Sequence, residues 1–370
     1  MPQQPRVVML VDLDYFYAQV EELRHPDFKG KPVVVGMYSG RTEISGAVAT
    51  SNYLARKCGV KSGIPLYLAK KRLEGTDAVF LPVDYDYYQQ VSDKVMAVLR
   101  RHADVLEIAG IDEAYLDVTQ KTGGHYDKAE KLVSEMKAEA KQEVGVTFSV
   151  GIGPNKLIAK IASDMHKPDG VTFVRPEQVQ TFLFPMPVDA LLGVGKKTVA
   201  KLEKMGVKSV GDLAKVDVQR IVAVFGKVIG VYFHNAANGV DNEPVEEAAE
   251  AESIGRMGTL KEDSRDPDFI MQKINQQIDE IHAEFTQKQL GYRLVGITVV
   301  MTDLSAKSRS KTLEKTAKDK ETIHNAAREL LEKYLTETDL AVRRIGVHVS
   351  RFSREERQQR QLTIFFPEKI

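Results

Sequence analysis

Hydrophobic residues follow two different periods along the first half of the chain, and together these periods predict alternating strands and helices. An apolar run at residues 7–12 ends in an acid and leads into apolar positions at helical spacing, which predicts a buried strand followed by a helix. Two later helices are expected, at residues 86–101 and 129–140. Three later strands are expected, at residues 106–108, 114–118 and 146–152. With the intervening insertion and its adjoining helix set aside, the order is βαββαβ, the ferredoxin-like arrangement.

The remaining segments differ in composition, which indicates further domains. Proline, glycine and lysine are frequent over residues 25–82, so we expect a small insertion of short elements there. Short helices separated by glycine follow from residue 174, and the glutamate-rich residues 241–252 predict an acidic linker. A last domain at residues 253–352 mixes both periods. Its predicted elements are helices at 267–286 and 319–335 and strands at 293–301 and 342–350.

Composition narrows the class of protein. The 370 residues are 43% hydrophobic and 28% charged, as in a globular protein that buries a core. No apolar run approaches the roughly 18 residues of a membrane span, and the N-terminus lacks a signal-peptide pattern, so we expect a cytoplasmic protein with no membrane partner. The single cysteine, Cys58, excludes an internal disulfide and a zinc site built on several cysteines. The net charge of zero neither indicates nor excludes nucleic acid, because a basic footprint can lie on one face.

Three acids are expected to converge at one end of the predicted sheet. Asp12 ends the first strand, and Asp112 and Glu113 lie where two later strands meet. Like charges at that separation are costly unless a cation neutralises them, and Mg²⁺ binds carboxylates together with phosphate oxygens. Two such ions would hold the attacking and leaving oxygens of a phosphoryl transfer. Taken singly, each acid also fits a solvated turn or a helix cap, and a cap is what we expect of Asp14.

Several residues near these acids fit a bound nucleotide. The ring of Tyr17 would exclude a 2′-OH from a bound sugar. Tyr53 and Arg56 share one face of a predicted helix, and a guanidinium suits phosphate. Lys156 and Lys160 stack on another helix, where a triphosphate would relieve their repulsion. Exposed, solvated helix faces are the plainer alternative for both pairs.

Four segments resemble the motifs of the Y-family DNA polymerases, most closely the DinB (polymerase IV) branch in its archaeal form. They are residues 11–21 (VDLDYFYAQVE), 45–50 (SGAVAT), 52–56 (NYLAR) and 111–117 (IDEAYLD). The resemblance continues in order along nearly the whole chain and implies an α+β fold with four domains. The boundaries that we expect are a palm at 1–24 and 83–173, fingers at 25–82, a helical thumb at 174–240, a linker at 241–252, an α/β little finger at 253–352 and a tail at 353–370.

The resemblance also implies roles for particular residues. Asp12, Asp112 and Glu113 would be catalytic and would bind two Mg²⁺ ions, for which Mn²⁺ can substitute, with the Leu13 carbonyl as a further ligand. Tyr17 would be the steric gate. The incoming nucleotide would contact Tyr15, Phe16, Tyr17, Thr50, Tyr53, Arg56 and Lys160. The nascent base pair would contact Met37, Tyr38 and Ala47, whose pocket would be roomy enough for damaged templates.

Two positions depart from the family pattern. Gly110 stands where a serine is usual before Ile-Asp-Glu, which removes no ligand. The linker is acidic where related archaeal enzymes tend to be basic, and acids repel DNA phosphates. Linker contacts to DNA are therefore not expected from Glu243, Glu246, Glu247, Glu250 and Glu252.

Two regions are candidates for DNA contact. Residues 193–195 (GVG) followed by Lys196 resemble a helix-hairpin-helix, in which Gly193 and Gly195 let the backbone approach a phosphate; a plain turn between helices is the alternative. In the last domain, alternating basic residues would line a sheet face along a duplex, although basic residues also protect sheet edges. They are Lys307, Arg309 and Lys311, with Arg343 and Arg344 on a later strand.

The end of the chain resembles a sliding-clamp binding box. The pattern Gln-x-x-Leu-x-x-Phe-Phe is formed by Gln359, Leu362, Phe365 and Phe366. Leucine and the two rings would anchor in an apolar pocket of the clamp PCNA. Residues 361–365 also approximate the bacterial clamp motif, and the archaeal character of the chain favours PCNA. Packing of this segment on its own domain is the alternative, which the exposed paired rings disfavour.

Three functions are compatible with these features. The favoured one is a monomeric, low-fidelity DNA-directed DNA polymerase for translesion synthesis, which uses primer–template DNA and dNTPs and lacks a second acidic constellation for proofreading. A palm-type nucleotidyl cyclase would leave the hairpin, the basic sheet and the tail unexplained. A non-enzymatic DNA-binding clamp adaptor would not require all three acids.

Overall fold

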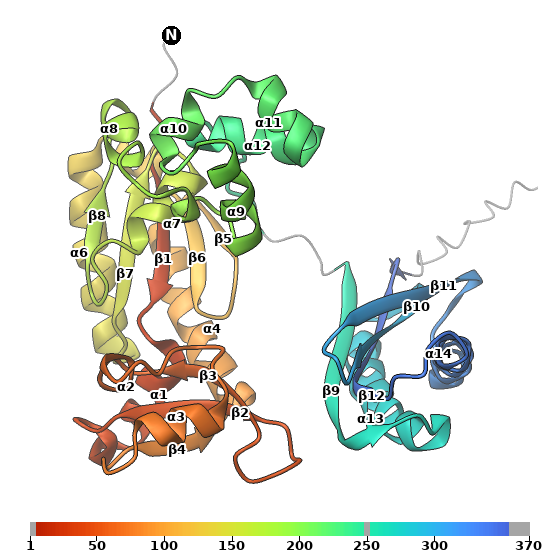
Figure 1. Ribbon diagram of the computed structural model, residues 1–370. Coiled ribbons are helices and arrows are strands. Elements are labelled where there is room, and N and C mark those ends of the chain that lie inside the picture. The colour runs from red at the N-terminus through yellow and green to blue at the C-terminus, as the bar shows by residue number, and fades with distance from the viewer. Residues whose placement is uncertain (1–4, 248–251, 355–370) are drawn as a thin grey trace, which may run out of the picture. The chain divides into compact units, whose positions relative to one another are not determined.

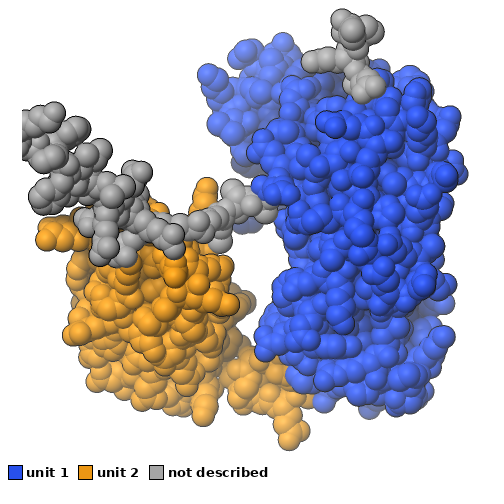
Figure 2. Space-filling model, turned by 180° about the vertical axis from the view of Figure 1, so that it is seen from behind, with its two compact units in different colours: residues 1–37, 47–248 blue, residues 38–46, 249–370 orange. Residues whose placement is uncertain are grey.

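The computed structural model describes residues 5–247 and 252–354 (Figure 1). The chain forms two compact units, one of residues 1–37 with 47–248 and the other of residues 38–46 with 249–370 (Figure 2). Within the described ranges, no helix has both the length and the apolar character that crossing a membrane requires.

A five-stranded sheet in the order β5-β6-β1-β7-β8 forms the centre of the first unit. The strands are β1 (Val8–Leu13), β5 (Val105–Ile108), β6 (Glu113–Asp117), β7 (Phe148–Gly153) and β8 (Val171–Phe173). β1 pairs antiparallel with both β6 and β7, which confirms the predicted ferredoxin-like core. Side chains alternate across β1, so Met9 and Val11 pack on one face of the sheet and Val8 and Leu10 on the other.

Two long helices, α4 (Tyr85–His102) and α6 (Tyr126–Glu143), pack side by side on the Met9 face. The core of this layer includes Tyr88 and Leu99 of α4 and Met136 of α6. The βαββαβ count set α4 aside, whereas the structure places its apolar stripe in the main core, inside the segment 83–173 that was expected to form the palm. Two shorter helices belong to the same unit, α1 (Phe16–Arg24) and α5 (Thr119–Thr122).

The opposite face of the sheet carries α7 (Lys156–Ser163), which packs on β7 and β1. A Cβ at Gly151 would lie 2.0 Å from the carbonyl oxygen of Ala159, so only glycine permits this approach. Asn155 caps α7, because its side chain accepts a hydrogen bond from the Ile158 N–H at 3.0 Å. Close packing and the cap together hold Lys160 over the sheet.

The proline-rich insertion forms the expected short elements around a three-stranded sheet in the order β3-β2-β4. These are β2 (Val33–Tyr38), β3 (Gly46–Ser51), α2 (Tyr53–Lys57), α3 (Leu66–Arg72) and β4 (Val79–Pro82). The Asn52 side chain accepts hydrogen bonds from Ala55 N–H at 3.0 Å and from Val33 N–H at 3.1 Å. It thereby caps α2 and ties this helix to β2.

A helical segment follows the sheet. Its helices are α8 (Val179–Leu183), α9 (Lys196–Lys204), α10 (Val210–Ala214), α11 (Val218–Phe225) and α12 (Lys227–Ala237). Leu183, Leu202 and Phe233 form its core together with Leu157 and Ile158 of α7. The segment is therefore anchored to the same helix that carries Lys160.

The acidic segment 241–247 lies on the α7 face of the sheet. Val245 is buried beside Val8, Leu10 and Ala159. Asp241 accepts a hydrogen bond at 3.0 Å from the backbone N–H of Leu157, where the first turn of α7 leaves N–H groups without helical partners. This part of the linker is thus an ordered component of the first unit.

Charge complementarity explains why these positions are acidic. Lys156 donates to Glu243 at 2.9 Å and to Glu107 of β5 at 2.7 Å. Glu247 pairs with Arg100 of α4 at 2.8 Å. The acids at 243 and 247 are therefore engaged with basic residues of the first unit, and Lys156 belongs to this contact rather than to a solvated face.

Replacing Val245 with aspartate is expected to release the linker from the sheet. The change removes a buried side chain and places a charge against Val8 and Leu10, at a cost of about 2 kcal/mol, or roughly thirtyfold in the opening equilibrium. Hydrogen exchange of the amides at 241–247 measures this opening. Val228→Asp is the control, since Val228 is 81% exposed. Equal exchange at 241–247 in both variants would contradict the docking.

The second unit is built on a four-stranded sheet in the order β11-β10-β12-β9. Its strands are β9 (Ser253–Ser264), β10 (Leu290–Met301), β11 (Ala306–Ala317) and β12 (Val342–Ser350), and β13 (Ser353–Arg354) pairs with the start of β10. One face of the sheet is covered by α13 (Pro267–Gln287) and α14 (Lys320–Leu335), whose apolar sides form a single core with Ile345, Val347 and Val349 of β12.

Candidate active site

The three predicted acids lie at one end of the central sheet. Asp12 and Glu113 are directly opposite each other in the β1–β6 pairing. Asp12 shares its face of β1 with Leu10, so its carboxylate lies on the side that carries α7. Asp112 precedes β6, and its carbonyl accepts a hydrogen bond from the Leu13 N–H at 2.8 Å. The antiparallel register therefore brings together acids that are far apart in the sequence.

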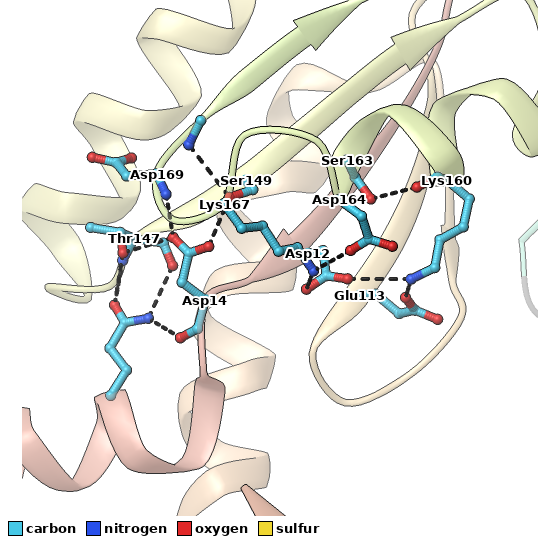
Figure 3. A network of polar contacts seen from close by, with 12 residues as sticks. Asp12, Asp14, Glu113, Thr147, Ser149, Lys160, Ser163, Asp164, Lys167 and Asp169 are labelled. Atoms are coloured by element: carbon cyan, nitrogen blue, oxygen red, sulfur yellow. Dashed lines mark hydrogen bonds and ion pairs between the residues drawn. The ribbon is translucent and has the colours of Figure 1, made fainter. Parts of the chain in front are cut away.

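Two lysines neutralise the Asp12 carboxylate (Figure 3). Lys160 of α7 donates to its Oδ2 at 3.2 Å and also bonds Glu113, while Lys167 donates to its Oδ1 at 2.7 Å. Burial alone would lower the pKa of Lys160, and the hydrogen bond to Glu113 and the charge of Asp12 outweigh it, so the pKa is raised. Within the described ranges, no group of three acidic, histidine or cysteine side chains is already arranged to hold a metal ion.

The site destabilises the ionised form of Asp112. Burial raises the pKa of Asp112, and the charges of Asp12 and Glu113 raise it further. A divalent cation would relieve this repulsion, and carboxylate oxygens are its preferred ligands. The donor set therefore fits a divalent metal, provided that the cation displaces the lysine ammonium groups. A Cβ at Gly110 would meet Asp112 Oδ1 and Glu113 Cγ, each at 3.4 Å, which is ordinary contact, so a larger residue at this position would not force the acids apart.

The sequence predicted that Asp14 caps α1, and this prediction was wrong. The N-cap residue is Tyr15, and Asp14 is instead 1% exposed within a hydrogen-bond network. Its carboxylate accepts from the Ser149 hydroxyl at 2.7 Å, the Thr147 hydroxyl at 3.0 Å and the Asp169 N–H at 2.8 Å (Figure 3). Asp14 thus ties the loop around residue 169 to the sheet.

A cavity of about 350 Å³ opens beside the acids. Its lining comes from both sheets and includes Asp12, Leu13, Tyr15, Phe16, Tyr17, Thr50, Tyr53, Arg56, Asp112 and Lys167. The hydroxyl of Tyr53 is buried with no hydrogen-bond partner in the described part of the chain. The Arg56 guanidinium lies 5.0 Å from the centre of the Tyr53 ring, so these two residues share one face as predicted. An orphaned hydroxyl next to a guanidinium suits an oxygen-rich anion.

The aromatic wall of this cavity is rigidly held. Tyr17 stacks on Tyr88 with ring centres 4.4 Å apart and planes 17° apart, and it meets Tyr85 edge-on at 6.2 Å. Tyr15 meets Tyr53 edge-on at 5.2 Å. Tyr15 also has a φ of 38°, a left-handed conformation that costs free energy in a residue other than glycine and that recurs at functional sites.

Four of the residues predicted to contact the nucleotide or the base pair are described by the structure but do not line this cavity. Lys160 is turned toward Asp12 and Glu113, and Met37, Tyr38 and Ala47 belong to β2 and β3. Met37 and Tyr38 are exposed at the end of β2. Their contacts with nucleotide or base pair stay predictions.

Sequence reasoning missed Lys167. It follows Asp164 by three residues and lies in a Lys-Pro-Asp-Gly turn, outside any periodic element. The ion pair with Asp164 at 2.9 Å and the one with Asp12 orient its ammonium group. The local sequence shows only a lysine directly before Pro-Asp-Gly. It contains no signal that this lysine contacts Asp12.

The predicted helix-hairpin-helix has the geometry of a tight turn. Gly193 has a φ of 80°, and α9 begins at Lys196, directly after the cap residue Gly195. A Cβ at Gly195 would meet nothing within 4 Å, so the turn is open on that side. Lys196 is exposed there. Phosphate contact at this turn stays a prediction.

Three basic residues of β11, Lys307, Arg309 and Lys311, were expected to line one sheet face along a duplex. The structure places them on the face that carries α14, and their contact with DNA stays a prediction. The register sets Arg309 opposite Ile297, whose side chain is buried on the helix side. Arg309 pairs with Glu337, just after α14, and Lys311 pairs with Glu329 of α14. β11 is an edge strand of its sheet, and Arg309 and Lys311 are already in ion pairs, while Lys307 lies over the ring of Tyr334. Arg344 lies opposite Val300 and is exposed, and Arg343 lies 3.8 Å from Asp263.

The predicted clamp-binding residues lie outside the described residues. They are Gln359, Leu362, Phe365 and Phe366.

Comparison with known proteins indicates one family along nearly the whole chain. Residues 11–164 match the impB/mucB/samB family, residues 189–241 the DNA polymerase-iota thumb domain, and residues 251–364 the impB/mucB/samB family C-terminal domain. The DNA polymerase IV of Nitrosopumilus maritimus is 43% identical over 98% of this chain and 100% of its own length.

Solved structures give the same answer. A Y-family DNA polymerase chimera of Dbh and Dpo4 is similar with a TM-score of 0.88 and 35% identity, covering 94% of this chain and 99% of that one. An insertion ternary complex of Dbh DNA polymerase is similar with a TM-score of 0.68 and 36% identity, covering 93% and 98%.

The chain belongs to the Y family of DNA polymerases, in the DNA polymerase IV (DinB) branch. It is a DNA-directed DNA polymerase of the translesion class and depends on divalent metal ions.

Proposed function

We propose that the protein extends a DNA primer by phosphoryl transfer with two Mg²⁺ ions, or Mn²⁺ in their place, held by Asp12, Asp112 and Glu113 with the Leu13 carbonyl. The observation that carries the proposal is the convergence of these acids beside a cavity of about 350 Å³. When bound, the ions activate the primer 3′-OH and stabilise the charge that develops on the transferred phosphoryl group.

The residues of this chain supply binding, orientation and sugar selection. Tyr53, whose hydroxyl lacks a partner among the described residues, and Arg56 donate to phosphate oxygens of the incoming dNTP. Tyr17 closes the cavity where the sugar lies and is held in place by Tyr88. Lys160, once displaced from Asp12, adds positive charge over the triphosphate. No group of the protein forms a covalent intermediate, since positioning and electrostatics suffice for this chemistry.

Domain roles follow from this assignment. The sheet with β1 and β6 serves as the palm, the insertion at 25–82 as the fingers, the helices at 174–240 as the thumb and the unit around 253–352 as the little finger. The turn at Gly193–Gly195 with Lys196, and the exposed Arg344, contact the primer–template duplex. The enzyme works as a monomer, because one chain carries every residue that the mechanism uses. It acts in the cytoplasm, at the nucleoid, where its DNA substrate lies. It lacks a proofreading exonuclease.

The test is primer extension on a primed template with Mg²⁺ and four dNTPs, compared between the wild type and variants of the three acids. The proposal expects template-dependent extension that requires both the metal and each acid. Extension that survives loss of an acid would remove that residue from the metal site.

Clamp binding is a second proposal, which rests on the sequence of the tail. Replacing both Phe365 and Phe366 with alanine is expected to weaken binding to PCNA by about thirtyfold, as for the loss of a hot spot worth about 2 kcal/mol. Removal of residues 359–370 should end stimulation by the clamp and leave basal synthesis intact. Thr363→Ala, at a variable position of the box, is the control. Stimulation that persists without the tail would refute the proposal.

A further inference from the structure

Lys167 lies at the meeting point of the metal site and the nucleotide cavity. Its ammonium group bonds Asp12 Oδ1 at 2.7 Å and Asp164 Oδ1 at 2.9 Å, and its side chain lines the cavity together with Tyr53 and Arg56. Lys160 bonds the other oxygen of Asp12. Each oxygen of this carboxylate therefore already has a cationic partner.

Hydrogen bonds from two sides hold the loop that carries Lys167. Asp14 accepts a hydrogen bond from the Asp169 N–H (Figure 3). Lys137 of α6 donates to both the carbonyl and the carboxylate of Asp169 at 2.7 Å. A Cβ at Gly170 would lie 1.7 Å from the His166 carbonyl oxygen, so the loop closes tightly on itself. A buried carboxylate that accepts three hydrogen bonds is costly to place unless its bonds are kept, so Asp14 holds this loop in one arrangement.

We propose that Lys167 is a resident counter-ion of Asp12 that the divalent cation must displace, and that the displaced ammonium then binds the triphosphate in the cavity that it lines. Asp14 is a positioning residue, which acts by holding the loop of Lys167. The proposal rests on the assignment of Asp12 as a metal ligand.

The physical basis is competition for one carboxylate. A lysine ammonium and a divalent cation cannot both bind directly to Asp12 Oδ1. The ion pair with Lys167 therefore weakens metal binding before the nucleotide arrives. The nucleotide offers the ammonium a new anionic partner, which removes that competition. Metal and nucleotide are thereby coupled, each favouring the binding of the other.

The first test is Mn²⁺ binding to the protein without DNA or nucleotide, with free Mn²⁺ measured by electron paramagnetic resonance. Lys167→Met keeps the length of the stem and removes the charge. It should bind Mn²⁺ about fivefold more tightly, the size expected from loss of one partly screened cation. Lys131→Met is the control, since Lys131 is 84% exposed on α6 and 3.8 Å from Glu135. Unchanged Mn²⁺ affinity in Lys167→Met would overturn the counter-ion role.

The second test is steady-state nucleotide insertion by the full chain on primed DNA. Loss of a triphosphate contact should raise the KM for the correct dNTP by about tenfold with little change in kcat. An unchanged KM would overturn the nucleotide role. Asp14→Asn should shift Mn²⁺ affinity and KM in the same directions, whereas a lowered melting temperature with neither shift would make Asp14 purely structural.

The two tests separate this inference from the polymerase mechanism. Tighter Mn²⁺ binding by Lys167→Met in a protein that does not extend primers would keep the counter-ion role and refute the mechanism. Normal extension that requires the acids, with Mn²⁺ affinity and KM unchanged in Lys167→Met, would keep the mechanism and refute the inference.

Discussion

Asp112→Ala is expected to lower template-dependent primer extension by about a thousandfold or more, because ligation of the catalytic metals contributes several kcal/mol of transition-state stabilisation. DNA binding should persist, since the residues proposed to contact the duplex lie on other elements. The measurement is single-nucleotide extension of a labelled primer, with a mobility-shift assay for DNA. Asp127→Ala is a matched control, because the Asp127 side chain is 87% exposed and distant in the fold on α6.

The same variant should be more stable than the wild type when no metal is present. Burial and the charges of Asp12 and Glu113 raise the pKa of Asp112, so the folded protein holds its ionised form at a cost. A protein with an acid whose pKa is raised on folding loses stability as the pH rises from the unfolded-state pKa of that acid through its folded-state pKa. Removing this acid should raise the melting temperature at pH 7 and less so at acidic pH. A drop in stability together with the lost activity would point to misfolding rather than to a missing ligand.

Tyr17→Ala is expected to admit ribonucleotides. A 2′-OH pressed against the ring costs about 3 kcal/mol, so its removal should lower discrimination between dNTP and rNTP by a factor of about a hundred. Use of dNTPs should change little. The measurement is the ratio of kcat/KM for a matched dNTP and rNTP opposite the same template base.

Tyr17→Phe separates the ring from its hydroxyl. The ring of Tyr17 is held by stacking on Tyr88 and by the edge of Tyr85, so phenylalanine should keep both the position and the discrimination. Unchanged sugar selection in Tyr17→Ala would refute Tyr17 as the gate. Lost selection in Tyr17→Phe would assign the gate to the hydroxyl.

The fold was predictable where its signals are local. The strand at 342–350 and the helix at 267–286 agree with β12 and α13, because buried faces impose periods of two and 3.6 on apolar residues. β9 was not predicted, because its outer face is polar and glycine-rich and its pattern is weak. The place of α4 in the main core depends on which helix packs beside α6, and no local pattern contains that information.

For the site too, some residues could be identified from the sequence and some contacts could not. Asp12, Asp112, Glu113, Tyr17, Tyr53 and Arg56 were identified from motif and spacing, and the structure places all but Glu113 in the lining of one cavity, with Glu113 directly opposite Asp12. The partners of Lys156 and Lys160 were not predictable, because their acids come from β1, β5, β6 and the linker.

By itself, the sequence determined the family, the core periodicity and the identity of the acids, because each of these can be recognised from short segments of consecutive residues. Only the tertiary structure decided that the acidic linker docks on basic residues, that Asp14 holds a loop instead of capping a helix, and that Arg309 faces α14. The physical reason is common to the three: charges and hydrogen bonds act across space, and the strand register that sets their distances is fixed by packing of the whole unit.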